Sequence, residues 1–317
     1  MSKYAIGIDF GTLSARALVA EIGTGRELGS ASMDYPHAVM NTALPDGTPL
    51  PPDWALQHPQ DYIDCLSAII PAAIEQSGVD RADIIALGVD CTACTLIPVD
   101  ASGTPLCFYP EYASNPHAYA KLWKHHASQK QANHITEVAR ARGESFLARY
   151  GGRVSSEWML PKVLQMLEED AALYAATDRF IEAGDWIVFQ LTGNECRAAC
   201  AAGYKAFWHK RDGYPSDAFF QAVHPGLAGF TSHKIRGNVY PAGWKAGEIT
   251  GSAARLTTLL PGTAVAVANV DAHVSMPVSY THLVFLFDYA HLFWLPRAGN
   301  GQRADRRAAI ARRARLN

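Results

Sequence analysis

The sequence predicts an α/β fold whose buried strands end in polar side chains. Three observations predict it. Strand-like alternation of apolar residues begins at residue 4. Two further apolar runs, 84–90 and 261–271, each end in a carboxylate, and a helical stripe of apolar residues lies in 58–77. Because open α/β sheets bind ligands where their strands end, we expect the functional residues at these ends.

Residues 4–20 are expected to form two strands joined by a tight polar turn. The turn, 9–14, holds one carboxylate, one glycine and two hydroxyls. Gly11 permits close backbone approach, and successive N–H groups in such a turn can bind an anion. Asp9 at a strand end suits a hydrated Mg²⁺. An ordinary hairpin with a glycine turn and a capping aspartate explains the same residues equally well.

The next elements follow from composition and period. A third strand is expected near 29–35, and the Pro- and Gly-rich stretch 36–58 reads as a surface loop or lid. The helix over 58–77 begins with a proline in its first turn. The near-continuous apolar run 84–90 predicts a strand covered on both faces. Further on, we expect strands at 96–99 and 105–109, helices at 116–142 (interrupted near Ser128), 156–169 and 216–223, and a strand leading into a helix at 178–192.

Composition excludes several classes of protein. The 317 residues carry a net charge of −2, which does not favour a nucleic-acid or membrane partner. Six cysteines include two close pairs, 91/94 and 196/200, a spacing that would fit zinc. Their apolar and alanine-rich surroundings favour buried free thiols instead. Free thiols, and a first strand that begins without a signal-peptide pattern, predict a cytoplasmic protein.

Two residues far from the first turn complete a pattern that suits phosphoryl transfer. This chemistry needs a phosphate cradle, Mg²⁺ and a carboxylate that accepts the proton of the attacking hydroxyl. Asp271, at the end of the run 261–271, suits the proton acceptor, and Lys205 suits a positive contact to a polar substrate. The simpler alternatives are a helix N-cap for Asp271 and a surface lysine for Lys205.

The chain resembles the FGGY carbohydrate kinases and, among these, the ribulokinases. The resemblance spans about residues 3–277. It is carried by the stretches 7–16, 88–95, 115–126, 151–158, 202–209 and 269–273. The glycerol kinases and xylulokinases carry different residues at the 90–95 turn, although a xylulokinase or another ketopentose or polyol kinase of this family remains the alternative.

The resemblance implies an actin-like, ribonuclease H-like domain with a mixed sheet flanked by helices. It also implies ATP- and Mg²⁺-dependent phosphorylation of L-ribulose at the 5-hydroxyl, in arabinose breakdown, and leaves open a homodimer for the longer family members. Carried over, Asp271 is the general base, and Ala93, Lys205 and Asp271 line the sugar pocket. The phosphate and nucleotide side comprises Asp9, Gly11, Thr12, Ser14 and Arg16, with Asp9 on Mg²⁺.

The resemblance ends before the chain does. Residues 1–277 match the family's N-terminal domain, whereas the Arg-rich stretch 278–317 is unlike the family. We interpret 278–317 as artefactual or disordered sequence. The family's second, nucleotide-binding domain has no counterpart here, so we expect impaired catalysis by this chain alone. Two other hypotheses stay open: a non-catalytic sugar-binding module, and a nucleic-acid or membrane-surface protein acting through its arginines.

Overall fold

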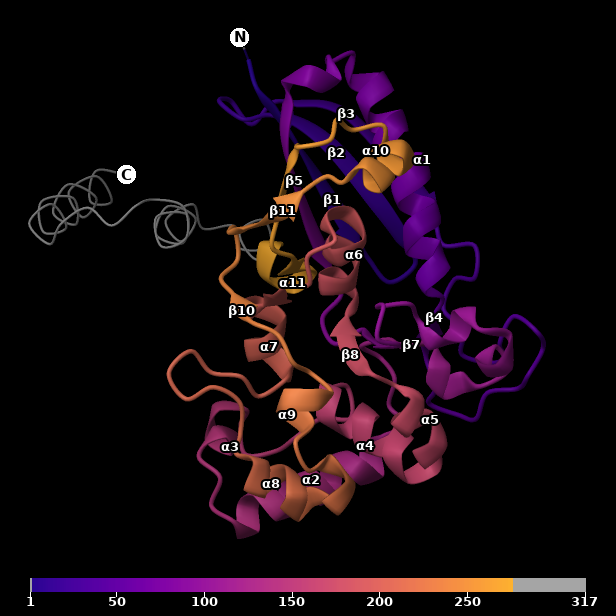
Figure 1. Ribbon diagram of the computed structural model, residues 1–317, viewed down its shortest axis with the longest axis vertical. Helices are drawn as coiled ribbons and strands as arrows, with labels where there is room; N and C mark the ends of the chain where they lie inside the picture. The colour runs from indigo at the N-terminus through magenta and orange to yellow at the C-terminus, as the bar shows by residue number, and fades with distance from the viewer. Residues whose placement is uncertain (1, 276–317) are drawn as a thin grey trace, which may run out of the picture. The chain divides into compact units, whose positions relative to one another are not determined.

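A computed structural model describes residues 2–275 of the chain. The chain divides into two units, 1–274 and 275–317, and the described helices and strands all belong to the first unit (Figure 1). The interpretation of 278–317 lies outside the described residues.

The organising element is a mixed seven-stranded sheet. Its strands are β1 (Tyr4–Phe10), β2 (Ser14–Glu21), β3 (Glu27–Asp34), β5 (Ile84–Cys91), β11 (Lys245–Glu248), β12 (Ala264–Ala266) and β13 (Asn269–Val270). The order is β11-β12-β5-β1-β2-β3, and β13 also pairs with β5. The β1–β2–β3 meander is antiparallel, whereas β5 runs parallel to β1, β12 and β13. The predicted mixed sheet is confirmed, with the 261–271 strand broken into two short pieces.

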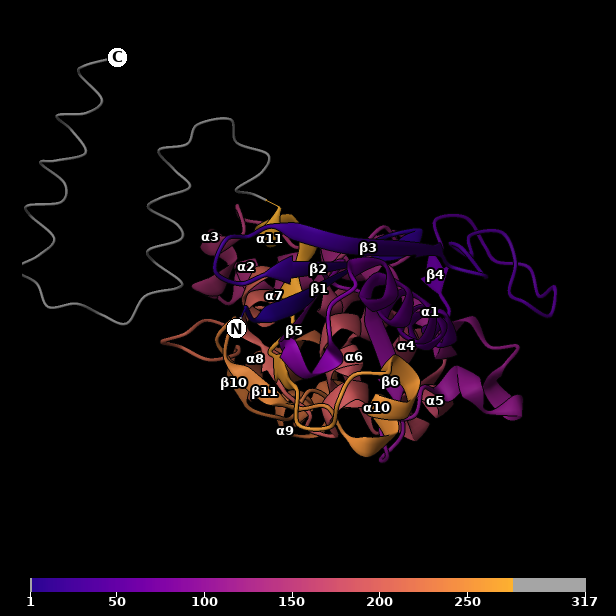
Figure 2. The same cartoon turned by 90° about the horizontal axis from the view of Figure 1, so that it is seen from above.

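The two faces of this sheet differ because side chains alternate along each strand. Ile6, Ile8 and Phe10 point into a core beneath α1 (Pro59–Ser77) and α6 (Ala183–Thr192), which lie on the same face of the sheet (Figure 2). The prediction that β5 is covered on both faces is wrong. Ile85 is 45% exposed, and the buried residues of the strand alternate with more exposed ones. The opposite face of β1 and β5 carries the polar strand ends.

Helix α1 crosses β3 so closely that one position accepts only glycine. A Cβ added at Gly29 would lie 2.4 Å from the Ala73 carbonyl oxygen and 2.6 Å from the Ser77 nitrogen. These are backbone atoms, which cannot turn aside as a side chain can. The helix itself begins at an N-cap, His58, whose ring accepts the Gln60 N–H, and ends at Gly78 in the left-handed conformation.

A second, four-stranded sheet lies beside the first core. Its order is β4-β7-β6-β8, formed by β4 (Leu56–Gln57), β6 (Leu96–Val99), β7 (Ala120–Lys121) and β8 (Arg179–Glu182). Part of its apolar side chains, those of Leu56, Leu96 and Phe180, join a second hydrophobic cluster with α2 (Gln129–Ala141), α3 (Phe146–Arg149), α4 (Met159–Glu169), α5 (Ala171–Ala176) and α8 (Asp217–Val223). The others, Ile97, Val99, Ala120 and Ile181, belong to the first core. The predicted strand at 96–99, the strand and helix within 178–192, and the helices within 156–169 and 216–223 are confirmed.

Two predicted elements are wrong. Residues 105–109 are not a strand, because Leu106–Phe108 form a short 3₁₀ helix between Pro105 and Pro110. Most of 116–128 is not helical: a 3₁₀ turn, Pro116–Ala118, leads into β7, and the helix begins at Gln129. The remaining α-helices and strands of the described residues are α7 (Ala199–Lys205), α9 (Phe230–His233), α10 (Gly251–Thr257), α11 (Asp271–Val274) and the strand pair β9 (Arg197–Ala198) and β10 (Val239–Tyr240).

Candidate functional site

Three carboxylates from distant parts of the sequence gather at the ends of neighbouring strands. Asp9 and Asp90 stand opposite each other in the parallel β1–β5 pair. Asn269 pairs with Asp90 in the β13–β5 ladder, and Asp271 follows β13 at the start of α11. The register of three parallel strands therefore builds the acidic group that the sequence places at strand ends.

Burial and neighbouring charges change the acidity of two of these carboxylates. Burial raises the pKa of Asp90 to about 8, helped by the charge of Asp9, by a hydrogen bond with it and by the charge of Asp271. Burial also raises the pKa of Asp271, which the positive charge of Lys205 opposes. A partly buried acidic group of this kind favours either a bound proton or a bound cation.

Asp9 has a positive partner within its own hairpin. Arg16 pairs with Asp9 across the β1–β2 ladder, and its guanidinium nitrogen Nη1 lies 3.2 Å from Asp9 Oδ2. Both side chains are substantially exposed, at 66% and 38%, so this ion pair contributes little to folding. The arginine is therefore free to meet an incoming anion.

The turn between β1 and β2 is closed by its own hydrogen bond. The Gly11 N–H donates to the Ser14 carbonyl oxygen at 3.0 Å, so this amide is not available to an anion, in contrast to the expected series of free N–H groups. Within residues 2–275, the amides of Thr12 and Leu13 have no hydrogen-bond partner and remain as donors. A Cβ at Gly11 would lie 3.3 Å from the Ser14 oxygen, which explains the glycine.

Three side chains from outside the hairpin hold this turn. Tyr35 donates its hydroxyl to the Gly11 carbonyl oxygen at 3.0 Å, and the buried Gln57 donates to the Thr12 carbonyl oxygen at 2.9 Å. The indole of Trp123 donates to Thr12 Oγ1 at 3.1 Å. Because indole is a donor only, the hydroxyl hydrogen of Thr12 stays available to another acceptor.

Lys205 is not the surface lysine of the simpler alternative. Its side chain is 13% exposed, and its Nζ lies 3.0 Å from Glu157 Oε2. It stands at the end of α7, and its charge reaches Asp271. The structure thus brings Lys205 and Asp271 into one electrostatic group across 66 residues of sequence.

Ala93 lies in the turn between β5 and β6. It is 7% exposed, and the following residue, Cys94, adopts a left-handed backbone with φ of 60°. Thr92 and Thr95 close the turn through a hydroxyl–hydroxyl hydrogen bond of 2.7 Å. Ala93 thus lies three residues after Asp90, in a turn that is fixed by this hydrogen bond.

Several residues around the site have no role that the sequence alone assigns. The sequence marks Asp90 only as a strand end, and Glu157 and Trp123 only as parts of longer stretches. His125 lies in the stretch 116–142 that was expected to be helical; it is fully buried, and its ring Nε2 lies 2.8 Å from Gln165 Oε1. Their partners lie far along the chain, as the contacts Trp123–Thr12, Glu157–Lys205 and His125–Gln165 show, so no spacing rule in the sequence relates them.

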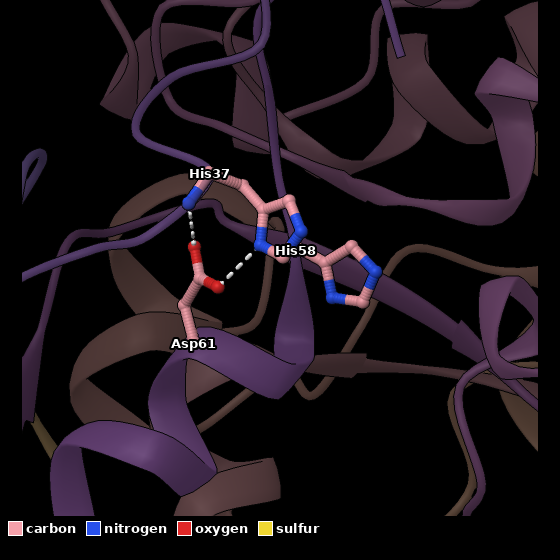
Figure 3. A group of neighbouring side chains, drawn as sticks. All are labelled: His37, His58 and Asp61. Carbon is pink, nitrogen blue, oxygen red and sulfur yellow. Dashed lines mark hydrogen bonds and ion pairs between the residues drawn. The ribbon is translucent and has the colours of Figure 1, made fainter. Parts of the chain in front are cut away.

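A separate group of potential metal ligands lies at the start of α1. The possible ligand atoms of His37, His58 and Asp61 lie within 4.8 Å of one another. Asp61 accepts both the backbone N–H and ring Nδ1 of His37, at 3.1 and 2.6 Å (Figure 3). The two rings are stacked, with planes 18° apart, so their in-plane lone pairs do not converge on one ion. This group ties the loop after β3 to the helix.

Two further observations concern the state of the cysteines and the possibility of a membrane-spanning helix. Five of the six cysteines are buried free thiols, and Cys200 is half-buried, with its sulfur 2.6 Å from His273 Nδ1. Within the described residues, neither close cysteine pair belongs to a group of three metal-ligating side chains. No helix in 2–275 has both the length and the apolarity to cross a bilayer.

Comparisons with known proteins identify the family of the chain. Residues 4–276 match the model of the FGGY family of carbohydrate kinases, N-terminal domain. Over 276 residues the chain is 52% identical to a ribulokinase of Geobacillus thermodenitrificans, covering 87% of this chain and 49% of that protein. A ribulokinase of Mycolicibacterium smegmatis is 53% identical over 277 residues, again covering 49% of its length. The chain therefore spans about half the length of these relatives.

Solved structures share the fold at much lower identity. A xylulose kinase from Rhodospirillum rubrum matches with a TM-score of 0.67 and 20% identity, covering 88% of this chain and 51% of that one. A gluconate kinase from Lactobacillus acidophilus matches with a TM-score of 0.66 and 16% identity, covering 87% and 50%. These matches confirm the predicted actin-like fold. Taken with the match over 4–276, they show that the chain belongs to the FGGY family of carbohydrate kinases through that family's N-terminal domain.

Proposed function

We propose that the chain supplies the sugar-binding and phosphate-facing part of an ATP-dependent ribulokinase. Such an enzyme transfers the γ-phosphoryl group of ATP to the 5-hydroxyl of L-ribulose. The observation that carries the proposal is the gathering of Asp9, Asp90 and Asp271 at neighbouring strand ends, within electrostatic reach of Lys205. The choice of sugar rests on the roughly half-identical relatives that are named ribulokinases.

In this proposal Asp271 is the general base. Its carboxylate accepts the proton of the sugar hydroxyl while the hydroxyl oxygen bonds to the γ-phosphorus and the bond to the ADP oxygen breaks. Burial raises the pKa of Asp271, which makes it a better proton acceptor than an exposed aspartate. Its Oδ1 accepts the Ala272 N–H at 2.5 Å, and this contact orients the carboxylate at the start of α11.

In this proposal a divalent cation would lie at the exposed edge of the carboxylates, next to Asp9. Mg²⁺ prefers hard oxygen ligands and keeps several waters, so one or two carboxylates suffice. Asp9 would hold the ion, and the charge of the ion would favour the ionised form of Asp90, whose pKa burial and the neighbouring carboxylates raise to about 8. When bound, the ion would neutralise charge on the phosphates. The remaining polar groups of the turn, which are Thr12, Ser14 and Arg16, would face the phosphates.

Lys205 and Ala93 shape the proposed sugar pocket. The ammonium of Lys205, held by Glu157, donates to hydroxyl or carbonyl oxygens of the sugar. Ala93 contributes backbone and a small methyl, so a ring or chain of sugar atoms can approach the turn. Both groups act on binding rather than on the proton transfer.

Calorimetric titration of the full chain tests this proposal without requiring turnover. We expect L-ribulose to bind at least tenfold more tightly than D-xylulose. Equal binding of the two sugars would favour a broader ketopentose kinase, and no binding of either would contradict the proposed sugar site. ATP with Mg²⁺ is the second ligand to titrate.

Asp271→Asn separates the base from the pocket. Removing the proton acceptor while keeping the shape is expected to lower any L-ribulose-dependent release of ADP by about 10²-fold or more. The dissociation constant for L-ribulose should change less than about fivefold, because asparagine keeps the hydrogen-bonding oxygen. ADP release that survives the substitution would contradict the role of Asp271.

A further inference from the structure

Lys162 is a fully buried cation behind the proposed sugar pocket. It lies in α4 and is 1% exposed, although lysine is rarely buried without a partner. Its Nζ donates to the carbonyl oxygens of Cys94 at 2.6 Å, Leu122 at 2.8 Å and Lys121 at 3.3 Å. An ammonium has three N–H donors, so these three carbonyls use all of them.

The three carbonyls belong to two segments that meet the ligands. Cys94 follows Ala93 in the turn between β5 and β6, where it has a left-handed backbone and lies outside both strands. Leu122 precedes Trp123, the residue whose indole holds the Thr12 hydroxyl. Lys162 therefore joins the turn of the proposed sugar pocket to the segment that supports the phosphate turn.

The link is reinforced from the other side. Lys121, also buried, donates its Nζ to the carbonyl oxygen of Lys162 at 3.1 Å and to Gln165 Oε1 at 3.2 Å. Each lysine thus holds the backbone of the other, and α4 is fixed against β7. Within the described residues, the Cys94 carbonyl has no hydrogen-bond donor other than Lys162.

We propose that Lys162 is a positioning residue for sugar binding, because its ammonium fixes the Cys94 carbonyl and so sets Ala93 at the pocket. This inference rests on the proposed sugar site, although the positioning itself is a property of the backbone. Lys162 does not touch the sugar. It acts through the turn that does.

The charge of Lys162 is what the carbonyls require. Burial lowers the pKa of Lys162 to about 8, so its ammonium loses its proton just above neutral pH. A neutral amine has one donor fewer and no charge, so the hold on the three carbonyls weakens. The titratable groups facing it are Cys94, Glu157, Glu182, Lys205, Lys121 and His125.

The test compares Lys162→Met with a matched control, Lys234→Met. Lys234 also caps backbone carbonyls, those of Tyr174 and Thr177, but far along the chain from the turn. Hydrogen exchange is followed at two reporters: the Thr92 amide, bonded to the Phe10 oxygen, and the Ala183 amide, bonded to the Thr95 oxygen. We expect tenfold or faster exchange at both in Lys162→Met and no change in Lys234→Met.

Sugar affinity provides the second readout. L-Ribulose should bind at least tenfold more weakly to Lys162→Met than to wild type at pH 7, and the wild-type affinity should approach that of the variant by pH 9.5. Unchanged exchange in Lys162→Met overturns the inference, as does unchanged affinity where wild type binds. If wild type binds no sugar, the proposed function fails, and the exchange data alone decide whether Lys162 holds the turn.

If Lys162→Met does not fold, the inference can still be tested by hydrogen exchange on the wild-type chain at different pH values. Exchange at Thr92 and Ala183, corrected for the intrinsic dependence on pH, should accelerate as the pH rises from 7 to 9.5. The Thr177 amide, bonded to the Leu173 oxygen, serves as the internal reference. Equal behaviour of all three amides would overturn the inference.

Discussion

At the scale of single residues, the site is defined by charges that the fold forces together. Asp9, Asp90 and Asp271 would repel one another if all were ionised, and burial together with the charges of Asp9 and Asp271 raises the pKa of Asp90 to about 8. Lys205 and Arg16 supply the opposing charge at two sides of the group. In the proposed function, a bound cation would reduce the repulsion among the carboxylates, and the positive side chains would attract a phosphate.

Asp90→Asn tests the repulsion among these carboxylates, which should make the stability of the wild-type chain depend on pH. The folded-state pKa of Asp90, about 8, lies above its ordinary value of 3.8, so the folded chain holds a proton that the unfolded chain has released. The stability that this group contributes is therefore present below about pH 4 and is lost as the pH rises through 8. We expect Asp90→Asn to match wild type near pH 4 and to be more stable at pH 9, measured by urea unfolding.

Asp100→Asn is the control for that comparison. Burial opposes the effect, but hydrogen bonds from Tyr109 and Ser102 lower the pKa of Asp100 to about 2. Its contribution is present above about pH 4 and lost only as the pH falls towards 2, so Asp100→Asn should destabilise the chain equally at pH 5 and pH 9. If the stability of Asp90→Asn relative to wild type depended on pH as that of Asp100→Asn does, the raised pKa of Asp90 would be contradicted.

Residue roles could be predicted only where a local pattern marked them. Asp9 and Asp271 end apolar runs, and Lys205 gained its role through resemblance, so the sequence points to all three. Lys162 sits in the apolar stretch 159–167, and a lone charge in such a stretch is the signal that could have revealed it. Glu157 and His125 had no local signal, because their partners are 48 and 40 residues away.

At the scale of elements, the sheet positions the site and the helices hold the sheet. The parallel β1–β5–β13 ladders set the carboxylates side by side, and α1 locks the β1–β2–β3 meander from one face. At the crossing of α1 and β3, the packing leaves no room for even a Cβ atom at Gly29.

Gly29→Ala tests the crossing. The added methyl would lie 2.4 Å from the Ala73 oxygen, so α1 or β3 must shift, and we expect a loss of about 1–3 kcal/mol in the free energy of unfolding. Gly7→Ala is the matched control, since a Cβ there meets nothing within 4 Å. Denaturant unfolding of both variants measures the difference, and equal losses would refute the close packing of α1.

Most elements were predictable because their apolar residues keep a clear period and their ends carry caps. The exceptions show the limit. The apolar run 105–109 is too short to separate a strand from a helical turn, and the two prolines that bound it favour the 3₁₀ form. In 116–128, pairing of β7 with β4 and β6 overrides local helix propensity, which a single sequence cannot reveal.

At the scale of the whole described unit, the site lies where two hydrophobic clusters meet. The first cluster lies under the large sheet and includes Ala93 and Cys94. The second surrounds α4 and includes Phe207, which follows Lys205. Trp158 packs against both, next to Glu157. The residues of the proposed pocket are thus held by the contact between the two clusters, which we call the joint, rather than by either cluster alone.

Trp158→Ala should weaken that joint. Truncating a half-buried tryptophan shared by two clusters is expected to cost about 2–4 kcal/mol in the free energy of unfolding. Trp244, which is 59% exposed, provides the control, and Trp244→Ala should change stability by less than about 0.5 kcal/mol. Thermal and urea unfolding measure both, and similar small losses would show that the clusters are held together elsewhere.

The most direct test of the proposed sugar site is an L-ribulose titration of Lys205→Met beside Lys234→Met. Lys205 stands between Glu157 and the charge of Asp271, whereas Lys234 caps carbonyls elsewhere. We predict that Lys205→Met weakens L-ribulose binding at least tenfold while Lys234→Met binds as wild type does. Equal affinity of wild type and both variants would contradict a sugar pocket built around Lys205.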